Sequence, residues 1–351
     1  MMELEVPCKQ KDKDKEEQEA PFSLSKVTPG SRKAERKWHS RARSIPKAVI
    51  VRRSLLSDAV RILEHVNFQY GIGDAYLDDV FGRKVDVESG NRQLVSYLRN
   101  EGLEGSIQVK WSDTLSCTAC MATSGGPRKL NKPHRRKYTL FLNSTRENMY
   151  LRAHGLTALA NHEIGTHYYR ARNDGFQVWY PCRAKFDMSR SRCYEMLLSE
   201  EGLATLNTYL SLNCKLLWKP ALTYYTAHMA QRMDTDELYS HIQCCVLDPD
   251  IRRKIVLRAK RSHGLKSSEG TDYFGCGWDQ CYFIGAVNIL RQLDNIDFTL
   301  MHSGKLSVED CERVGRLAKT TVLKLPQFIC TEENARLYCC TLAEIKAANF
   351  L

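Results

Sequence analysis

The segment HEIGTH brings together three side chains that could bind and use a metal ion. His162 and His167 each offer an imidazole nitrogen, and Glu163 offers a carboxylate that can accept a proton. A hydrolytic zinc site takes three ligands from histidine and carboxylate side chains and keeps a fourth position for water. We therefore predict that His162 and His167 hold one zinc ion per chain and that Glu163 is the catalytic base for the attacking water.

The spacing of the two histidines does not suit a regular α-helix. They lie five residues apart, and five residues turn about 140° past one full revolution of such a helix. A single π-type turn would restore the alignment, and turns of this kind occur inside helices at functional sites. Gly165 lies between the histidines and lowers the resistance to the distortion. We predict a local widening of the helix around Ile164 to Thr166.

A third ligand is expected from a second helix downstream of the first. In SEEGLA, Glu201 is the preferred candidate and Glu200 the alternative. In zinc peptidases with a ligand on a second helix, the carboxylate often precedes a small residue, and Glu201 is followed by glycine. His154 and His228 are predicted to be structural residues or supports of the ligands and not ligands themselves.

If the site cleaves peptide bonds at a chain end, it also needs a cation for the terminal carboxylate, and sequence spacing does not choose among the candidates near the motif. These are Arg170, Arg172, Lys185, Arg190 and Arg192. Four tyrosines could stabilise an oxyanion beside the metal, although such residues are more often packed aromatics. They are Tyr168, Tyr169, Tyr194 and Tyr282.

The elements that must position these side chains point to a mainly helical α+β domain with a small β-sheet preceding the HExxxH helix. Residues 106–111, 115–122 and 137–143 are rich in β-forming residues. Residues 144–175 predict one long helix, with Ser144 and Glu147 as its capping box, and SEEGLATLNTYLSL predicts the second, with Ser199 as its N-cap. Further helices are predicted at 91–99 and from Ser54 or Ser57, Asp234, Asp248 and Ser307.

The beginning of the chain differs from the rest in composition. The whole sequence has a formal net charge of +11, and we expect residues 1–46 to form a disordered basic arm and residues 47–351 the folded domain. Between residues 26 and 53 only Glu35 opposes the cations Lys26, Arg32, Lys33, Arg36, Lys37, Arg41, Arg43, Lys47, Arg52 and Arg53. Such a run favours an anionic partner at low salt, but a solvated tail without a partner is equally compatible with it.

Neither a secretory signal nor a membrane span is expected, because the first residues are charged and no long apolar stretch follows. We therefore expect a cytoplasmic protein. Most of its 14 cysteines are predicted to be reduced and buried. This includes Cys117 and Cys120, which form a CxxC in an expected strand where they would point to opposite faces, and the adjacent pairs Cys244/Cys245 and Cys339/Cys340 in expected helices.

Three segments resemble the microtubule-associated tyrosine carboxypeptidases. They are NHEIGTH at 161–167, SEEGLATLN at 199–207 and, less specifically, DQCYFIGAVNILR from 279. The resemblance implies a zinc metallo-carboxypeptidase domain at 47–351 that removes the C-terminal tyrosine of α-tubulin. It also implies that His162, His167 and Glu201 hold zinc and that Glu163 is the catalytic base. The basic arm suits the acidic tubulin tails, and the implied location is on microtubules of the cytoskeleton.

Two other classes of function compete with this one. The chain could be a microtubule-binding protein whose zinc site is structural or inactive, because PCRAKFDMSRSRCYEMLL at 181–198 differs from the family's usual proline-containing approach to its EEG motif. Zinc content without released tyrosine would favour that hypothesis. Binding of nucleic acid through the arm is disfavoured, because Trp38 is its main aromatic residue and no recognised nucleic-acid module follows.

Overall fold

The computed structural model describes residues 53–115, 117–124, 135–188, 194–262 and 278–351. The predicted arm at 1–46 and the candidates Arg190 and Arg192 lie outside these residues. Three strands and a series of helices make up the described part. The strands are β1 Ile107–Ser112, β2 Ala119–Ser124 and β3 Lys137–Asn143. The helices that precede and contain the histidines are α2 Leu56–Tyr70, α3 Gly73–Phe81, α4 Val87–Asn100, α5 Gly155–His162, the π-helical segment η5 Glu163–Tyr168, and α6 Tyr169–Asp174.

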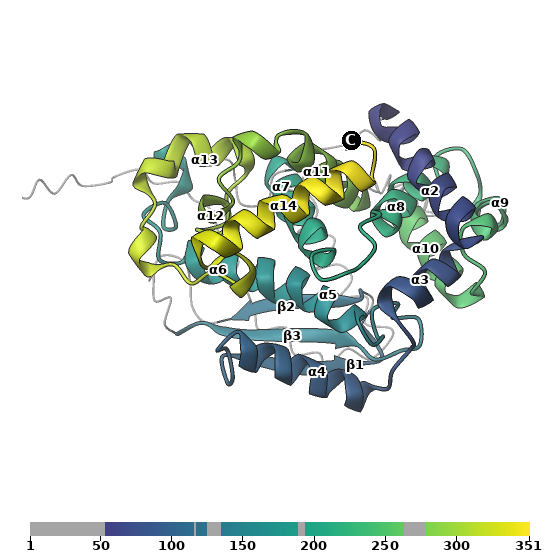
Figure 1. The fold of residues 1–351 in the computed structure, drawn as a ribbon, viewed down its shortest axis with the longest axis horizontal. Coiled ribbons are helices and arrows are strands. Elements are labelled where there is room, and N and C mark those ends of the chain that lie inside the picture. The colour runs from purple at the N-terminus through teal and green to yellow at the C-terminus, as the bar shows by residue number, and fades with distance from the viewer. Residues whose placement is uncertain (1–52, 116, 125–134, 189–193, 263–277) are drawn as a thin grey trace, which may run out of the picture.

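The remaining α-helices begin with α7, which contains the second predicted ligand segment. They are α7 Tyr194–Thr208, α8 Trp218–Met229, α9 Thr235–His241, α10 Pro249–Ser262, α11 Cys281–Arg291, α12 Phe298–Met301, α13 Val308–Val314 and α14 Glu332–Ala348. The predicted class, a mainly helical protein with a small sheet ahead of the histidine helix, is confirmed at this level (Figure 1). None of the described helices is long and apolar enough to cross a membrane.

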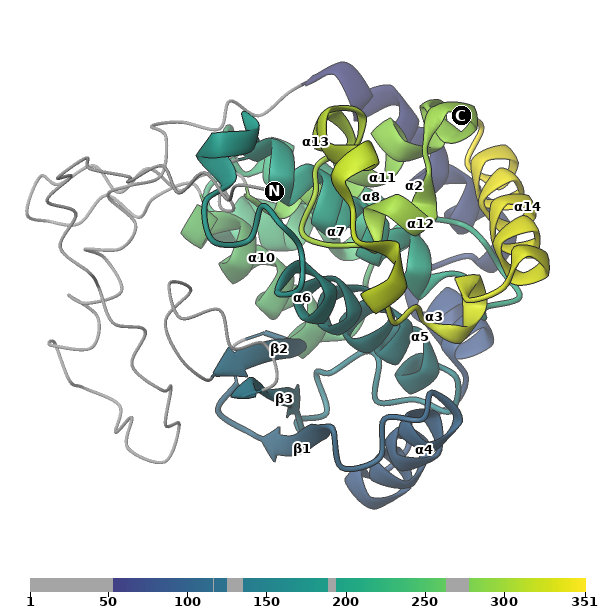
Figure 2. The ribbon, with the colours of Figure 1, turned by 90° about the vertical axis from the view of Figure 1, so that its left-hand side faces the viewer.

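The sheet has the strand order β1-β3-β2, with β1 parallel and β2 antiparallel to the central β3. Alternate residues of β3 are buried, and Tyr138, Leu140 and Leu142 pack in one cluster with leucines of α4 and α5. Both helices therefore lie on the same face of the sheet (Figure 2). The edge strand β2 runs beside η5, so the sheet helps to position the histidine-bearing segment.

The second ligand helix is held by an unusually close helix crossing. α7 packs along α11 in the larger core cluster, and Gly202 faces Gly285 at the crossing. A Cβ added to Gly202 would lie 2.3 Å from the carbonyl carbon of Gly285, and a Cβ added to Gly285 would lie 2.0 Å from the carbonyl oxygen of Leu198. Only glycine permits this backbone approach. The small residue after Glu201 is thus needed for packing.

Two predicted helix starts are wrong. The histidine helix begins at Gly155 and not at Ser144, because the side chain of Asn143 accepts hydrogen bonds from the backbone amide and the hydroxyl of Thr145 at 2.8 and 2.6 Å and stabilises a turn instead. The second helix begins at Tyr194, so Ser199 lies inside it. The Ser199 hydroxyl does not cap its own helix; it accepts instead from the Val308 amide, the first of α13, at 3.1 Å.

Three other predicted starts are confirmed. Asp234 and Ser307 each form a capping box with the third residue of the following helix. The Asp248 carboxylate accepts from the amides of the first turn of α10 at 3.0 and 3.1 Å. The helix predicted at 91–99 lies within α4, and α2 follows the short 3-10 turn at Arg53–Leu55. Local capping chemistry was sufficient at these places.

The described cysteines are free, as predicted, but most of them are not buried. Only Cys245 and Cys281 are buried, whereas Cys120, Cys339 and Cys340 are exposed. The position of Cys117 also differs from the prediction, because β2 begins only at Ala119. The prediction weighed the average burial of cysteine and could not tell the solvent face of a helix such as α14 from its core face.

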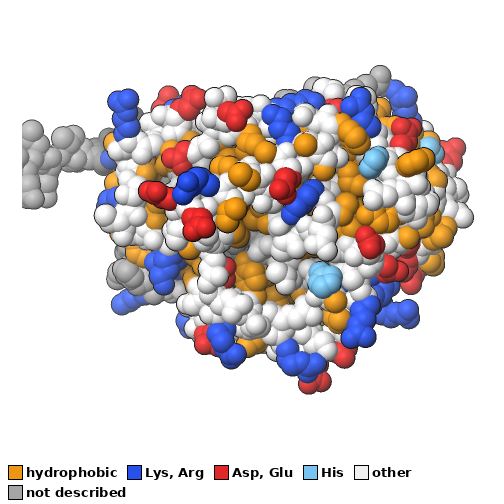
Figure 3. Space-filling view, viewed as in Figure 1, with side chains coloured by type: hydrophobic (Ala, Val, Ile, Leu, Met, Phe, Trp, Pro, Cys, Tyr) orange, Lys and Arg blue, Asp and Glu red, His pale blue; other side chains and the backbone are white. Residues whose placement is uncertain are grey.

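Charges of both signs are interspersed on the face of the molecule drawn in Figure 3, and neither sign gathers into a patch there. Apolar side chains lie between them. This face therefore does not account for the expected attraction to an anionic partner, which was predicted from the arm outside the described residues.

Candidate metal centre

The helix that carries both histidines widens where the sequence predicted it. η5, Glu163–Tyr168, is a π-helical segment between the α-helical turns of α5 and α6. The hydrogen bonds of a π-helix join residues five apart, so His162 and His167 lie one above the other on the same side. Their ring centroids are 5.1 Å apart. The predicted distortion around Ile164 to Thr166 is confirmed.

A buried chain of polar side chains holds this π-turn in place. The Thr166 hydroxyl donates to the Asn161 carbonyl at 3.2 Å, and the Asn207 amide donates to the Thr166 hydroxyl at 2.8 Å. Tyr338 of α14 donates in turn to the Asn207 side-chain oxygen at 2.7 Å. On the other side, Tyr97 of α4 donates to the Asn161 side chain at 2.9 Å. The wide turn is thus anchored to three other helices by groups that would be costly to leave unpaired.

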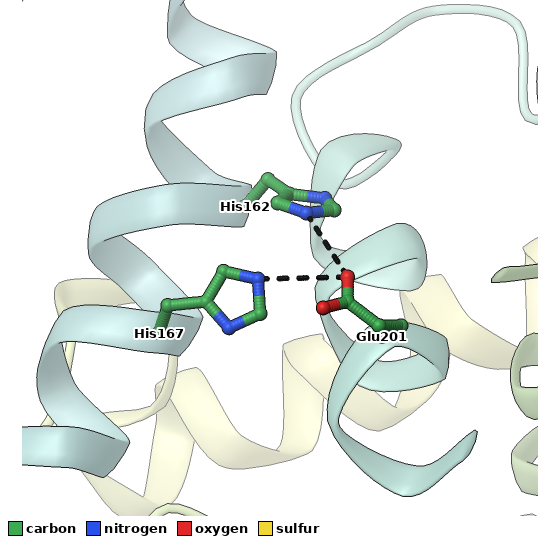
Figure 4. A group of neighbouring side chains, drawn as sticks. All are labelled: His162, His167 and Glu201. Atoms are coloured by element: carbon green, nitrogen blue, oxygen red, sulfur yellow. Dashed lines mark ion pairs between the residues drawn. The ribbon is translucent and has the colours of Figure 1, made fainter. Parts of the chain in front are cut away.

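The two imidazoles and the carboxylate of Glu201 converge on one point, as Figure 4 shows. One ligand atom from each residue lies within 4.8 Å of the other two, and this is the only such group of three among the described histidine, cysteine and acidic residues. Glu201 Oε2 is 3.6 Å from Nε2 of His162 and 3.6 Å from Nε2 of His167. The atoms come from α5, η5 and α7, so the site joins two helices.

The other nitrogen of each ring is already engaged, which fixes which nitrogen faces Glu201. Nδ1 of His162 lies 3.1 Å from the Thr208 hydroxyl, which donates its own proton to the Ala204 carbonyl and can therefore accept from Nδ1. Nδ1 of His167 lies 3.0 Å from a Glu200 oxygen, which can only accept from it. When the rings are neutral, both Nδ1 atoms carry the proton, so both Nε2 atoms present a lone pair. Hydrogen-bonded support of this kind is typical of metal-ligating histidine.

This donor set fits a zinc ion. The Nε2 atoms of the two imidazoles and a carboxylate oxygen of Glu201 face one another. A separation of 3.6 Å is too long for a hydrogen bond, but ligands around a tetrahedral zinc ion are about 3.4 Å apart. Three protein ligands leave one tetrahedral position for water or substrate. The geometry therefore suits a catalytic type of zinc site.

The electrostatics of the site favour a cation. Burial opposes protonation of His167, but the carboxylates of Glu201 and Glu200 outweigh it and raise the pKa of His167 to about 10. Burial likewise opposes ionisation of Glu200, but Lys305 at 2.9 Å and His167 hold the pKa of Glu200 well below its usual value. The pKa of Glu201 is also lowered, by His167 and His162 against the effect of burial. The carboxylates thus attract positive charge to the imidazoles, which a divalent cation can supply.

Glu163 lies at the start of the π-turn, between the converging side chains and the edge of the sheet. It is 6% exposed, and its Oε2 accepts a hydrogen bond from the Met121 amide of β2 at 3.0 Å. Its charge contributes to the raised pKa of His167, which places it in the electrostatic surroundings of the same ring. No described group donates to its Oε1, so one carboxylate oxygen is available to accept a proton.

The predicted carboxylate anchors on α6 are occupied elsewhere. Arg170 is fully buried and donates to the carbonyls of Met301, Gly304 and Leu306. Arg172 donates to Asn173 and to the Val322 carbonyl at 2.9 and 3.2 Å. Both arginines therefore tie the C-terminal part of the chain to α6. Lys185 is exposed on the short helix Arg183–Phe186, and nothing in the structure places it at the site.

One of the four predicted tyrosines, Tyr282, lies beside the site. Its ring centroid is 6.4 Å from that of His162, and the charge of Glu201 is the main cause that raises the pKa of its hydroxyl. Tyr168 packs edge to face on Tyr138, and the Tyr169 hydroxyl donates to Glu101 at 2.7 Å. His154 and His228, predicted not to be ligands, do not belong to the described metal-binding group.

Several known proteins are similar in sequence to this chain over most of its length. Human microtubule-associated tyrosine carboxypeptidase 1 is 34% identical over 257 residues, which are 73% of this chain and 49% of that protein. The mouse protein of the same name is 31% identical over 286 residues, or 80% of this chain and 56% of that protein. The mouse protein MATCAP2 is 31% identical over 277 residues, or 78% and 49%. No family model matches the chain.

The chain is a homologue of the microtubule-associated tyrosine carboxypeptidases. It spans about half the length of the curated relatives that it matches. The resemblance that was inferred from HEIGTH and SEEGLA therefore extends well beyond these two motifs. In this homologue of the carboxypeptidases, the two motifs are the segments that the fold brings face to face (Figure 4).

The residues that support the candidate ligands of this carboxypeptidase homologue were not identified from its sequence. Glu200 was considered only as an alternative ligand, but it contacts Nδ1 of His167 and so supports that ring from behind. Thr208 lies two turns beyond Glu201 on α7, a spacing that could have indicated its contact with His162. Lys305 carries no local signal, because its contact with Glu200 joins residues that are far apart in the chain.

Proposed function

We propose that the chain is a zinc-dependent carboxypeptidase that removes the C-terminal tyrosine of α-tubulin. The proposal is carried by the convergence of His162, His167 and Glu201, with both imidazole lone pairs fixed toward one carboxylate oxygen. The names of the relatives supply the reaction class and the terminal residue. Microtubules are accordingly the proposed partner and the place where the protein acts.

The three ligands would hold the ion and keep one position free. Zinc bound there would act as a Lewis acid on the scissile carbonyl and make the attacking water more acidic. Thr208 and Glu200 would keep the two rings in the required tautomer and orientation. The close crossing at Gly202 and the π-turn would keep α5 and α7 at a fixed separation, because tightly packed elements cannot shift without a clash.

Glu163 would move the proton that the reaction releases. Its Oε1 would accept a proton from water as the water oxygen adds to the carbonyl carbon of the last peptide bond. The same carboxyl group would then give the proton to the tyrosine nitrogen as the carbon–nitrogen bond breaks. The Met121 amide would hold the carboxylate in place through Oε2. Water is consumed, and the products are a shortened chain and free tyrosine.

The test compares Glu163→Gln with the wild-type protein. Metal analysis should find about one zinc ion per chain in both, because Glu163 is not a proposed ligand. An acidic peptide that ends in tyrosine should release tyrosine about 10²- to 10⁴-fold more slowly with the variant, as expected for loss of a general base. Mass spectrometry of both products measures the rate.

Glu195→Gln is the matched control, because Glu195 lies on the exposed first turn of α7. It should keep the wild-type rate. Equal rates for Glu163→Gln and wild type would disprove the assigned base. Zinc in the wild-type protein with no released tyrosine would instead support a structural site in a microtubule-binding protein.

A further inference from the structure

A peptide bond next to the chain end brings the terminal carboxylate close to the reacting carbonyl. Only a nitrogen and a Cα atom separate the two carbonyl carbons, so they lie within about 4 Å of each other. A carboxypeptidase therefore needs its anchoring cation within about one side-chain length of its metal ligands. The arginines of α6 do not meet this need, since they bind backbone carbonyls. Lys305 is paired with Glu200.

Arg258 of α10 is linked to the metal ligands by a single side chain. Tyr282 lies beside His162 at one end, and at the other end its hydroxyl is 3.4 Å from Nη2 of Arg258. The guanidinium carbon of Arg258 is 5.7 Å from the centroid of the Tyr282 ring. The phenol thus spans the distance from the ligands to a cation. No sequence pattern indicated this, because α10 carries no part of either motif.

The guanidinium of Arg258 is held in place and still has donors to spare. Its Nε and Nη2 donate to the two oxygens of Asp279 at 2.7 and 2.6 Å. Nη1 donates to no group in the described part of the chain, and the side chain is 45% exposed. A fork that is fixed on one edge and free on the other is well suited to bind a second carboxylate. Asp279 is then a positioning residue for Arg258.

A second cation, Lys219, borders a small cavity beside Arg258. Lys219 borders it together with Arg258, Asp279, Thr223 and Thr226, and no acceptor among the described residues pairs with its ammonium group. The two threonine hydroxyls donate to carbonyls of their own helix and present only lone pairs. Burial and the nearby Arg258 lower the pKa of Lys219 to about 7. When Lys219 is protonated, two cations face one carboxylate and leave the cavity short of negative charge.

We propose that Arg258, positioned by Asp279 and supported by Lys219, binds the C-terminal carboxylate of the peptide substrate. This inference rests on the proposed carboxypeptidase function and assigns the group that restricts it to chain ends. The terminal residue would then lie along Tyr282, between the metal ligands and the guanidinium. A substrate whose terminal carboxyl group is amidated would lose the charge that Arg258 recognises.

Binding is measured in the zinc-loaded Glu163→Gln protein, which should hold the peptide without cleaving it. The probe is an acidic peptide ending in tyrosine, as the free acid and as the C-terminal amide. The parent protein should bind the free acid about 10- to 100-fold more tightly, as expected for a charge-assisted pair at a half-exposed site. Adding Arg258→Gln should abolish this preference, whereas adding Arg253→Gln, an exposed arginine of the same helix, should preserve it.

Kinetics in the otherwise wild-type protein provide a second measurement. Arg258→Gln should raise KM for the free acid about 10- to 100-fold and change kcat less, because an anchoring contact acts in both the bound and transition states. Lys219→Met does not touch the Asp279 pair and should reduce the preference for the free acid by several-fold, which tests the cavity if Arg258→Gln lowers zinc content. An undiminished preference in both variants would overturn the proposal.

The two proposals fail separately. Tyrosine release by the wild-type protein together with equal affinity for acid and amide would retain the carboxypeptidase function and reject the Arg258 subsite. A preference for the free acid that is lost in Arg258→Gln, without any tyrosine release by the wild-type protein, would retain the subsite as an anion site and reject the hydrolytic function.

Discussion

The hydrogen bond at Nδ1 of each histidine determines whether Nε2 can bind a metal ion. In a free imidazole either nitrogen can carry the proton. Here Thr208 and Glu200 accept from Nδ1 of His162 and of His167, respectively, so in the neutral rings the lone pairs of both Nε2 atoms face Glu201. Residues of this supporting kind often affect metal affinity nearly as much as the ligands do. The value of Glu200 to the site therefore lies in its contact with His167.

Replacing Thr208 with valine tests this at the scale of one hydroxyl group. Thr208→Val keeps the shape of the side chain but removes the acceptor for His162, so zinc affinity should fall by about 10- to 100-fold. Titration against a chromophoric chelator measures the zinc dissociation constant. Thr205→Val is a suitable control, because Thr205 is also buried on α7 and is not near either ring in the described contacts. Equal affinities for the two variants would contradict the assigned role.

The π-turn is a property of several elements together. A π-turn contains one residue more than an α-helical turn, so it aligns two histidines that are five positions apart. A π-turn is, however, rarely the most stable form of an isolated helix. Three helices donate hydrogen bonds to this network. Tyr97 of α4 donates to Asn161, Asn207 of α7 donates to Thr166, and Tyr338 of α14 donates to Asn207. The surrounding helices therefore stabilise the geometry that the proposed metal site requires.

Removal of the Thr166 hydroxyl should weaken this support. Thr166→Val leaves the Asn207 amide without its acceptor and should lower the free energy of unfolding by about 1–3 kcal/mol. Thr226→Val is the control, because Thr226 is equally buried but its hydroxyl only donates to the Leu222 carbonyl of its own helix. Urea unfolding of the two variants gives the comparison. A loss no greater for Thr166→Val than for Thr226→Val would argue against the network.

At the scale of the whole molecule, buried polar contacts connect α6 and the residues directly after it to the segment around His302. Asn173 of α6 donates to the His302 carbonyl at 2.8 Å, and Gln177 donates to the Ser303 carbonyl at 3.0 Å. The His302 ring is itself fully buried, with Nδ1 2.8 Å from the Phe298 carbonyl. Burial, with a contribution from Arg170, lowers the pKa of His302 from 6.5 to about 4.

This depressed pKa makes stability depend on pH. The unfolded chain binds a proton at His302 below pH 6.5, and the folded chain does not until about pH 4. The contribution is therefore fully present above pH 6.5 and is lost as the pH falls toward 4, by about 2 kcal/mol between pH 7 and pH 5. His302→Asn keeps a donor for the Phe298 carbonyl but cannot titrate, so its free energy of unfolding should fall less over this interval. Urea titrations at both pH values measure the difference, and parallel losses would disprove it.

The sequence by itself determined the types of the candidate ligands, the need for a π-turn and several helix starts. Histidine and carboxylate chemistry is a property of the residues, and a spacing of five is incompatible with a regular helix whatever surrounds it. Capping at Asp234, Asp248 and Ser307 involves only neighbouring residues. The same local reasoning failed at Ser144 and Ser199, where Asn143 and Val308 offered competing partners.

Only the tertiary structure shows that Glu201, and not Glu200, converges with both histidines, and it alone shows the contacts of Thr208, Lys305 and Arg258. Adjacent glutamates on a helix point about 100° apart, and which of them faces the histidines depends on how α7 is rotated. The contact of Gly202 with Gly285 fixes that rotation. Lys305 and Arg258 reach the site through contacts between distant segments, and such contacts leave no periodic signal in the chain because packing, not spacing, creates them.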